Sequence, residues 1–304
     1  MPTDVLSRPT VDLDAEARAV SSDVDALFHR VLAPPGDGRD RLYAAIAHAA
    51  IGGGKRLRPL LTIATARLFG VDRQRALRAG AAVEAIHVYS LIHDDLPCMD
   101  DDDLRRGKAT VHKAFDEATA VLAGDSLHAL AFGILADPAT HENPIVRADL
   151  VHDLARASGP EGMAGGQMLD LAANGATLDL GAVTRLQQLK TGALIEYAVE
   201  AACIMGGIDR HARTPYRGYA RNVGIAFQIT DDLIDHHGSQ DLAGKRVGKD
   251  AAAGKATFVS LLGPERAAAQ AALLVDQAIE HLHDHGAEAD LLRAIARFAI
   301  ERNH

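Results

Sequence analysis

The sequence predicts an all-α protein: a single domain of roughly ten to twelve helices around a central cavity. Alanine and leucine dominate, runs of β-branched residues are few, and apolar residues recur at three- and four-residue spacings, as in 194–205 and 271–282. Short polar clusters interrupt this pattern, but no long linker does, so we expect one domain over residues 1–304. A helix bundle of this size can hold a ligand in its core.

The interruptions order the predicted helices along the chain. They are rich in Gly, Pro or polar residues and lie at 33–40, 52–59, 136–144, 173–181 and 207–215. The apolar segment that follows the second break runs to an aspartate pair near residue 95, where we expect a long helix to end. Residues 236–257 form the longest stretch with a weak helical pattern, and helical periodicity returns at 271–282.

The composition narrows the class of protein. The chain has 304 residues, 48% of them hydrophobic, which suits a soluble globular protein with a sizeable core. Its net charge of -9 argues against nucleic acid as a partner. Two cysteines, Cys98 and Cys203, cannot make a disulfide framework, which favours the cytoplasm. The first residues lack the apolar core of a signal peptide, and no run approaches 18 uninterrupted apolar residues, so we expect no membrane insertion.

An aspartate-rich segment, LIHDDLPCMDDDDLRRG at 91–107, follows an apolar helical pattern. Asp94, Asp95 and Asp100 stand at i, i+1 and i+6, so a continuous helix would turn Asp100 away from Asp94. Pro97 disfavours helical backbone at the residue before it and removes a backbone donor. We therefore expect the helix to end near Asp95 and the chain to fold Asp100 back toward the pair.

A second segment, ITDDLIDHHGSQDLAGKRVGKDAAAGKAT at 229–257, resembles the first in kind. Each has an apolar lead, an aspartate pair, a further aspartate and then basic residues with glycine. Asp231, Asp232 and Asp235 stand at i, i+1 and i+4, and therefore share one sector of ~100° on a helix. Three carboxylates placed so close would repel one another unless cations lie among them.

Two explanations fit these acidic segments. Each could be a solvated helix end, as most charge runs are. Aspartates at a helix C-terminus oppose the helix dipole, however, and two such motifs favour a bound cation. Mg²⁺ is the natural candidate, because it binds carboxylate oxygen and completes its shell with water and phosphate. An EF-hand fits poorly, since DDDDLRRGKAT lacks its glycine and its closing glutamate.

Basic residues gather beside both acidic segments. They are Lys55, Arg56, Arg58, Arg105, Arg106, Lys190, Lys245, Arg246, Lys249 and Lys255. Each group alone could be a basic surface cluster. Together they predict a site with two acidic walls and a basic rim, which suits phosphorylated substrates because Arg grips phosphate in a bidentate way and Lys adds a point charge.

These segments together resemble the trans-isoprenyl diphosphate synthases (the polyprenyl synthetase family), most closely its bacterial farnesyl-type members. The matching motifs occur in family order and are GGGKRLRP, YSLIHDDLPCMDDDDLRRGKAT, LAGDSL, GGQMLDL, LKTGALI, FQITDDLID and GKRVGKD. The resemblance implies an isoprenoid synthase bundle and a homodimer. It also implies Mg²⁺-dependent head-to-tail condensation of isopentenyl diphosphate with dimethylallyl or geranyl diphosphate.

The resemblance also implies a role for each matching residue. Asp94, Asp100 and Asp231, with Asp95 and Asp235 beside them and Asp232 in support, would bind three Mg²⁺ ions, for which Mn²⁺ can substitute. Arg105, Lys190, Lys245 and Lys255 would contact the allylic diphosphate. Lys55, Arg58, His87 and Arg106 would hold the diphosphate of isopentenyl diphosphate. Thr191 and Gln228 would line the reaction centre, and Gln167 and Asp170 would face the cavity.

The implied product is a C15 chain. Tyr89 stands five residues before Asp94, roughly 7.5 Å along the helix, and Ser90 stands four before it. In the family, an aromatic residue at the position of Tyr89, together with the insertion that holds Pro97, marks farnesyl synthases. The ring would form the floor of the tunnel for the growing tail, and a C20 product is the alternative.

Other functions compete with this reading. His93 and Asp94 mimic the dyad of HD-type metal phosphohydrolases, but that reading leaves DDLID and GGGKRLRP unexplained. A class I terpene cyclase also binds its metal ions through aspartate motifs, but it normally lacks the Lys, Arg and His residues that bind a second substrate. A non-catalytic synthase subunit usually loses an aspartate motif, and this chain keeps both.

Overall fold

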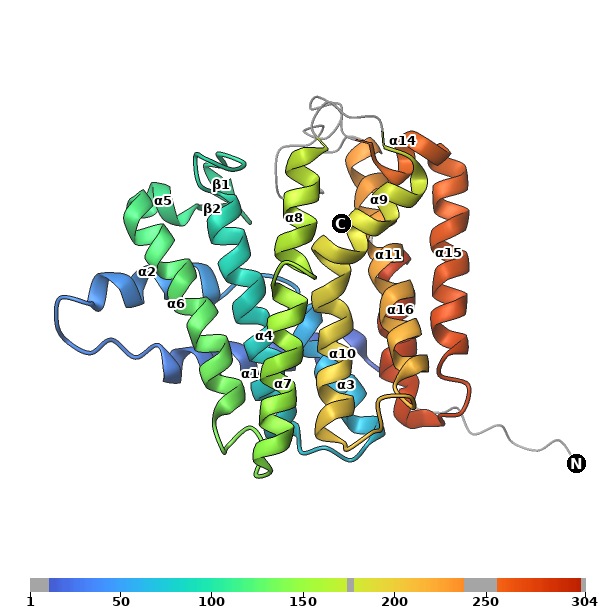
Figure 1. Ribbon diagram of the computed structural model, residues 1–304, viewed down its shortest axis with the longest axis horizontal. Helices are drawn as coiled ribbons and strands as arrows, with labels where there is room; N and C mark the ends of the chain where they lie inside the picture. The colour runs from blue at the N-terminus through green and yellow to red at the C-terminus, as the bar shows by residue number, and fades with distance from the viewer. Residues whose placement is uncertain (1–10, 174–177, 238–255, 302–304) are drawn as a thin grey trace, which may run out of the picture.

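Helices account for nearly all regular structure in residues 11–173, 178–237 and 256–301, the part of the chain that the computed structural model describes (Figure 1). In chain order they are α1 (Leu13–Val31), α2 (Asp40–Ala50), α3 (Leu57–Leu68), α4 (Arg73–Asp94), α5 (Val111–Ala114), α6 (Glu117–Ala136), α7 (Pro144–Ser158), α8 (Met163–Ala172), α9 (Leu180–Gln187), α10 (Ala193–Met205), α11 (Thr214–His237), α14 (Phe258–Leu262), α15 (Pro264–Glu280) and α16 (Asp290–Glu301). Twelve of these have eight or more residues, which confirms the predicted all-α class and helix number.

Short polar side chains start several helices where the sequence breaks predicted a boundary. The side chain of Asn143 accepts from the backbone of the first turn of α7, whose first residue is proline, and Asp179 caps α9 in the same way. Asp72 and Asp116 cap α4 and α6. Such caps satisfy backbone N–H groups that have no partner within the helix and typically contribute about 1 kcal/mol each.

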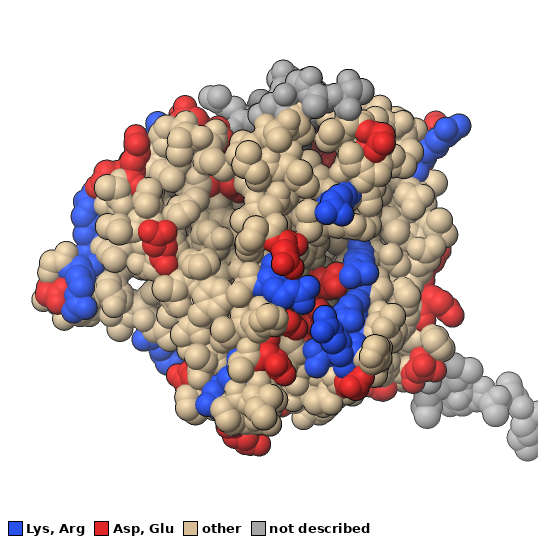
Figure 2. Space-filling model, viewed as in Figure 1, with Lys and Arg blue, Asp and Glu red and all other residues tan. Residues whose placement is uncertain are grey.

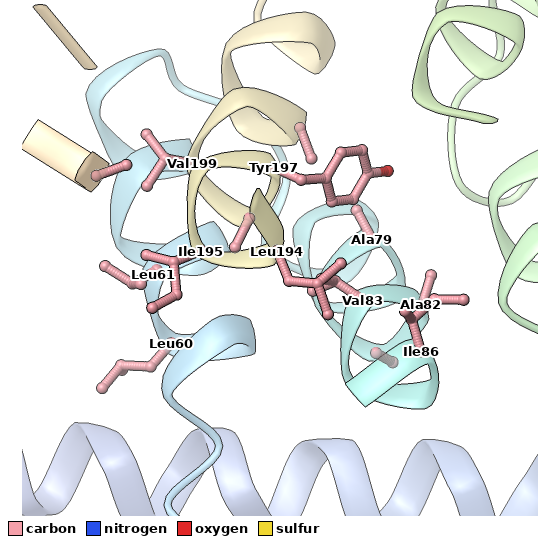
Figure 3. Close-up of a cluster of buried hydrophobic side chains, with 14 of the residues drawn as sticks. Leu60, Leu61, Ala79, Ala82, Val83, Ile86, Leu194, Ile195, Tyr197 and Val199 are labelled. Atoms are coloured by element: carbon pink, nitrogen blue, oxygen red, sulfur yellow. The ribbon is translucent and has the colours of Figure 1, made fainter. Parts of the chain in front are cut away.

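The core lies around α4, which packs against α3, α6 and α10. Figure 3 shows its centre, where Leu61 of α3 lies beside Ile195 of α10 and Val83 of α4 lies beside Leu194 of α10, all at most 2% exposed. Helix α4 is buried on nearly every side between Ala76 and Ile86. A helix enclosed in this way can carry polar residues from its C-terminal turns into the interior of the domain.

Helix α11 lies beside α10 and packs against α15 and α16 (Figure 1). Two ion pairs join α10 to α11: Arg217 with Glu200 at 2.6 Å and Arg221 with Glu196 at 2.7 Å. Figure 2 shows basic and acidic side chains intermixed in this region. The Arg217–Glu200 pair is half-buried, whereas Arg221 is exposed, and an exposed pair stabilises a fold by at most about 1 kcal/mol.

A small hairpin after α4 departs from the purely helical prediction. Strands β1 (Leu104–Arg105) and β2 (Lys108–Ala109) pair antiparallel through a two-residue turn. The turn residues Arg106 and Gly107 both have positive φ, 53° and 75°. This conformation matches the twist of a two-residue hairpin and places two consecutive arginines at its tip.

Candidate active site

A cavity of about 300 Å³ opens where α4 ends, between α4, α8 and the π-helical turn η1 (Gln188–Gly192). Its lining brings together seven residues with a predicted substrate, metal or product-length role, in addition to Gln167, which was predicted to face the cavity. They are Arg58, His87, Tyr89, Ser90, Asp94, Lys190 and Thr191. Leu91, His93, Met99, Met163, Ala164 and Gln167 complete the lining, so the walls combine apolar and charged groups.

The first acidic segment folds as predicted. Helix α4 ends at Asp94, Asp95 is its C-cap, and the N–H of Asp100 donates to the carbonyl of Asp94 at 2.8 Å. The N–H of Asp101 donates to the carbonyl of Leu96, and Asp101 itself has a φ of 48°. The turn after Pro97 thus returns Asp100 to the end of the helix that carries Asp94.

Asp94 has an unusual electrostatic environment. The pKa of its carboxyl is raised to about 6, chiefly by burial and also by the charges of Asp100 and Asp95, against the opposing effect of Lys190 and Arg105. The raised pKa means that the negative charge of the Asp94 carboxylate is only partly compensated by the cations of the protein. A cation that joins the carboxylates of Asp94 and Asp100 would stabilise both.

Asp95 is engaged by Arg105. Its carboxylate, buried with 4% of the residue exposed, accepts from Nε of Arg105 at 2.7 and 3.0 Å and lies 2.6 Å from Nη2. Burial works to lower the pKa of Arg105, but the hydrogen bond and charge of Asp95 outweigh it and raise that pKa. Asp95 therefore fixes the position of a cation at the rim of the site.

Arg58 and His87 form the opposite, basic wall. The Nε of Arg58 is buried and has no hydrogen-bond partner within the described residues. Burial lowers the pKa of His87 well below its usual range, and the nearby charges of Arg58 and Arg106 add to that effect, so the imidazole is neutral at physiological pH. A buried donor without a protein partner calls for a ligand or water, and Arg58 is one of the residues that line the cavity.

Arg106 reaches this wall from the hairpin. Its guanidinium lies against the backbone of Gly54, where an added Cβ would come within 2.4 Å of Nη1. Gly54 has a φ of 84°, so glycine suits both the backbone and the contact. The first basic motif and the hairpin therefore meet at this point, although they are about fifty residues apart in sequence.

Arg56 does not belong to the basic rim, contrary to our grouping from sequence. It is 2% exposed, and its guanidinium donates to Glu84 at 3.0 Å and to Asp25 at 2.7 Å. Lys55, predicted to bind the second diphosphate, is exposed and holds Nζ 5.6 Å from the ring centre of Phe298. It is not among the residues that line the cavity.

Lys190 lies in the π-helical turn and is paired with Asp170 of α8 at 2.8 Å. Gly166 permits this close approach, since a Cβ there would come within 2.1 Å of the Lys190 backbone nitrogen. Single π-helical turns occur frequently at functional sites because they shift the direction of side chains along a helix. Gln167, from the same helix as Asp170, reaches the cavity lining.

The second acidic motif lies in the last turns of α11, which packs against η1. Asp231, Asp232 and Asp235 stand on one continuous helix, as predicted. Asp232 is 8% exposed and accepts from Nε2 of Gln228 at 3.1 Å and from the N–H of Phe258 at 3.0 Å. Lys245 and Lys255, predicted to contact the allylic diphosphate, lie outside the described residues.

The donor set can be tested against Mg²⁺. In residues 11–173, 178–237 and 256–301, no three His, Cys, Asp or Glu side chains converge as a ready-made metal cage. Mg²⁺ usually takes only one or two carboxylates and completes its shell with water and substrate phosphate. The paired Asp94 and Asp100, with the raised pKa of Asp94, therefore fit an ion that arrives with a diphosphate.

Comparisons with known proteins extend these local observations over the chain. The profile of the polyprenyl synthetase family matches residues 39–297. The chain is 42% identical to the farnesyl diphosphate synthase of Escherichia coli (strain K12), over 96% of this chain and 100% of that one. It is 43% identical to geranylgeranyl pyrophosphate synthase 11 of Arabidopsis thaliana, over 86% and 75% respectively. The apo structure of an FPP/GFPP synthase from Zymomonas mobilis matches with a TM-score of 0.88 and 56% identity, over 95% and 99%.

Proposed function

The chain belongs to the polyprenyl synthetase family, and on that premise we propose that it is a prenyltransferase that makes farnesyl diphosphate. It condenses isopentenyl diphosphate head-to-tail with dimethylallyl or geranyl diphosphate. The observation that carries this proposal is the cavity lined by Asp94, Lys190 and Arg58, whose buried Nε has no partner among the described residues. Two diphosphates need separate cationic side chains around one apolar space. The lining of this cavity supplies Arg58 for one diphosphate and Lys190 for the other.

The cationic side chains divide between the two substrates. Arg58, neutral His87 and Arg106, with Lys55 nearby, hold the diphosphate of isopentenyl diphosphate. Lys190 and Arg105, with Lys245 and Lys255, contact the allylic diphosphate. Lys190 exchanges its bond to Asp170 for one to phosphate when the substrate enters, because the ammonium already lies at the cavity wall.

The mechanism separates charge between the allylic carbon and the leaving diphosphate, and side chains around the cavity stabilise this separation. Fixed cations stabilise the leaving diphosphate as the allylic carbon–oxygen bond ionises. Bound substrates must displace water from the cavity, because water would capture the carbocation. Thr191 and Gln228 line the reaction centre, the isopentenyl double bond attacks, and the departing diphosphate accepts the proton. No protein nucleophile takes part in this mechanism.

Mg²⁺ is the cofactor that these residues fit, with Mn²⁺ as a substitute. Asp94, Asp100 and Asp231, with Asp95, Asp232 and Asp235 in support, would hold three ions together with the allylic diphosphate. The ions would supply Lewis-acid neutralisation of the leaving group. Asp94 is primed for this role by the raised pKa of its carboxyl, since its charged form lacks sufficient compensation within the protein.

Tyr89 sets the product length in this proposal. Its ring lines the cavity beyond Asp94, where the tail of the allylic substrate must extend, and Ser90 lies beside it. Similarity to geranylgeranyl and FPP/GFPP synthases makes longer products the second candidate. We expect C15 from the wild type and a shift toward C20 or longer from Tyr89→Ala. If that variant still makes only the C15 product, Tyr89 does not determine product length.

We further propose a cytoplasmic homodimer that uses the outer face of α6 and α8. Val121, Leu122, Met168 and Leu169 are 42% to 62% exposed there, and Figure 2 shows few charged side chains over these helices. Helix α6 is apolar enough to span a membrane by composition, but it packs along α4 as part of the domain. Light scattering should find a dimer that Leu122→Glu dissociates and Leu273→Glu, an equally exposed change on α15, does not.

The position of His93 argues against the alternative function, an HD-type metal phosphohydrolase. Its Nε2 lies 3.1 Å from the carbonyl of Val121, and Gly124 packs against the ring, so the imidazole is directed toward α6. An assay with Mg²⁺, isopentenyl diphosphate and each allylic diphosphate in turn tests the proposal. Farnesyl diphosphate formation supports it. Release of phosphate or a cyclic terpene without chain elongation, or no turnover at all, contradicts it.

A further inference from the structure

Tyr89 is one of four aromatic rings in contact along α4 and α6. Its ring meets that of His93 with centres 5.7 Å apart at 77°, and that of His128 at 5.1 Å and 85°. His128 in turn meets Phe132 at 5.1 Å and 70°. Edge-to-face contacts of this kind are favourable and directional, so each ring restricts the orientation of the next.

The two histidines approach Tyr89 from different elements. His93 lies four residues after Tyr89 on α4 and reaches Val121 near the start of α6, while Tyr89 meets His128 two turns later. The two helices therefore run antiparallel here, and Phe132 lies one turn farther from Asp94. Tyr89 and His93 line the cavity, whereas His128 does not and stands behind the ring on the exposed side of α6.

We propose that His128 is a positioning residue for product length, which keeps the ring of Tyr89 across the end of the cavity. The inference rests on the proposed prenyl transfer. A tyrosine on a helix can swing about its side-chain torsions, and a growing apolar tail would push it aside if nothing stood behind it. His128, braced by Phe132, closes that route.

The first test compares products. His128→Ala should raise the ratio of C20 to C15 product by about two- to tenfold, the range that one lost ring contact allows. His128→Phe should restore the wild-type ratio, and His283→Ala, the same kind of change at an exposed histidine outside α4 and α6, should not alter it. In the Tyr89→Ala background, His128→Ala should leave the ratio unchanged because no ring remains to be held.

The second test needs no turnover. The chain has five tyrosines, so aromatic NMR of tyrosine-labelled protein gives few signals, and Tyr89→Phe identifies the one that matters. His128→Ala should shift the Tyr89 resonance and leave the other four in place. The inference is overturned if that resonance does not move, or if the variant makes products in the wild-type ratio. A wild-type enzyme without prenyl transfer would refute the proposed function, and the NMR result would still decide whether His128 holds the ring.

Discussion

Replacing Gly54 by alanine should displace Arg106 and weaken binding of isopentenyl diphosphate alone. A Cβ at this position would lie 2.4 Å from Nη1, 2.7 Å from Cζ and 2.8 Å from Nη2 of Arg106, whereas ordinary contacts begin at 3.4 Å. The guanidinium must therefore retreat by about 1 Å. It can do so because it is the flexible end of a side chain, so the change affects ligand position more than folding.

The expected loss follows from the interaction that Arg106 would make with phosphate. A hydrogen bond to a charged group contributes about 1.5–3 kcal/mol, so its loss raises KM for isopentenyl diphosphate about ten- to a hundredfold. Gly54→Ala also places alanine at a φ of 84°, which costs roughly 1–2 kcal/mol of stability. Gly52→Ala is the matched control, because Gly52 has a φ of 72° but its added Cβ would lie 3.7 Å from Lys108 and clear of Arg106.

Steady-state kinetics with each substrate varied in turn provide the assay. Gly54→Ala should raise KM for isopentenyl diphosphate and leave the allylic KM within about twofold, while both glycine variants lose similar stability. In the Arg106→Ala background, Gly54→Ala should have no further effect. Equal KM values for the two glycine variants, or a full additional loss without the Arg106 side chain, would refute the reasoning.

The other predictions concern the charged walls. Asp94→Ala and Asp231→Ala should each lower kcat/KM by orders of magnitude with an unchanged circular dichroism spectrum; retention of more than about a tenth would contradict the metal role. Arg58→Ala should mainly raise KM for isopentenyl diphosphate, and Lys190→Ala should act on the allylic KM or on kcat; the reverse division would show that the two sites are misassigned. In metal-free wild type, burial raises the pKa of Asp94 from 3.8 to about 6, so stability should fall by up to about 3 kcal/mol as pH rises from about 4 to 6. Asp94→Asn should therefore have the higher Tm at about pH 7.5, with the gap closing below about pH 4; a constant gap would argue against a raised pKa.

Rules of local backbone geometry predicted correctly how the two aspartate motifs fold. Pro97 ends α4 and returns Asp100 to Asp94, and the spacing of Asp231, Asp232 and Asp235 suits the continuous helix α11. These features depend on helix geometry and on proline chemistry over a few residues. Short-range rules are sufficient there because the deciding interactions lie within one or two turns.

Features that depend on tertiary packing could not be read from the sequence. Nothing in GGGKRLRP distinguishes the buried Arg56, held by Glu84 and Asp25, from the cavity-facing Arg58. The hairpin is too short to show an alternating pattern, and the π-helical turn that carries Lys190 differs from an α-helix by one residue. The engagement of Asp95 by Arg105 also requires the hairpin, which orients that side chain.

A crystal structure of the protein with Mg²⁺, isopentenyl diphosphate and a non-ionising allylic thiolodiphosphate tests the central claim most directly. We predict that the allylic diphosphate lies between Asp94 and Asp231 with metal bridging them, and contacts Lys190. The second diphosphate should accept a hydrogen bond from Nε of Arg58, the buried donor that lacks a partner among the described residues. A diphosphate bound away from both aspartate motifs, or an Arg58 Nε that remains without a ligand, would contradict the account.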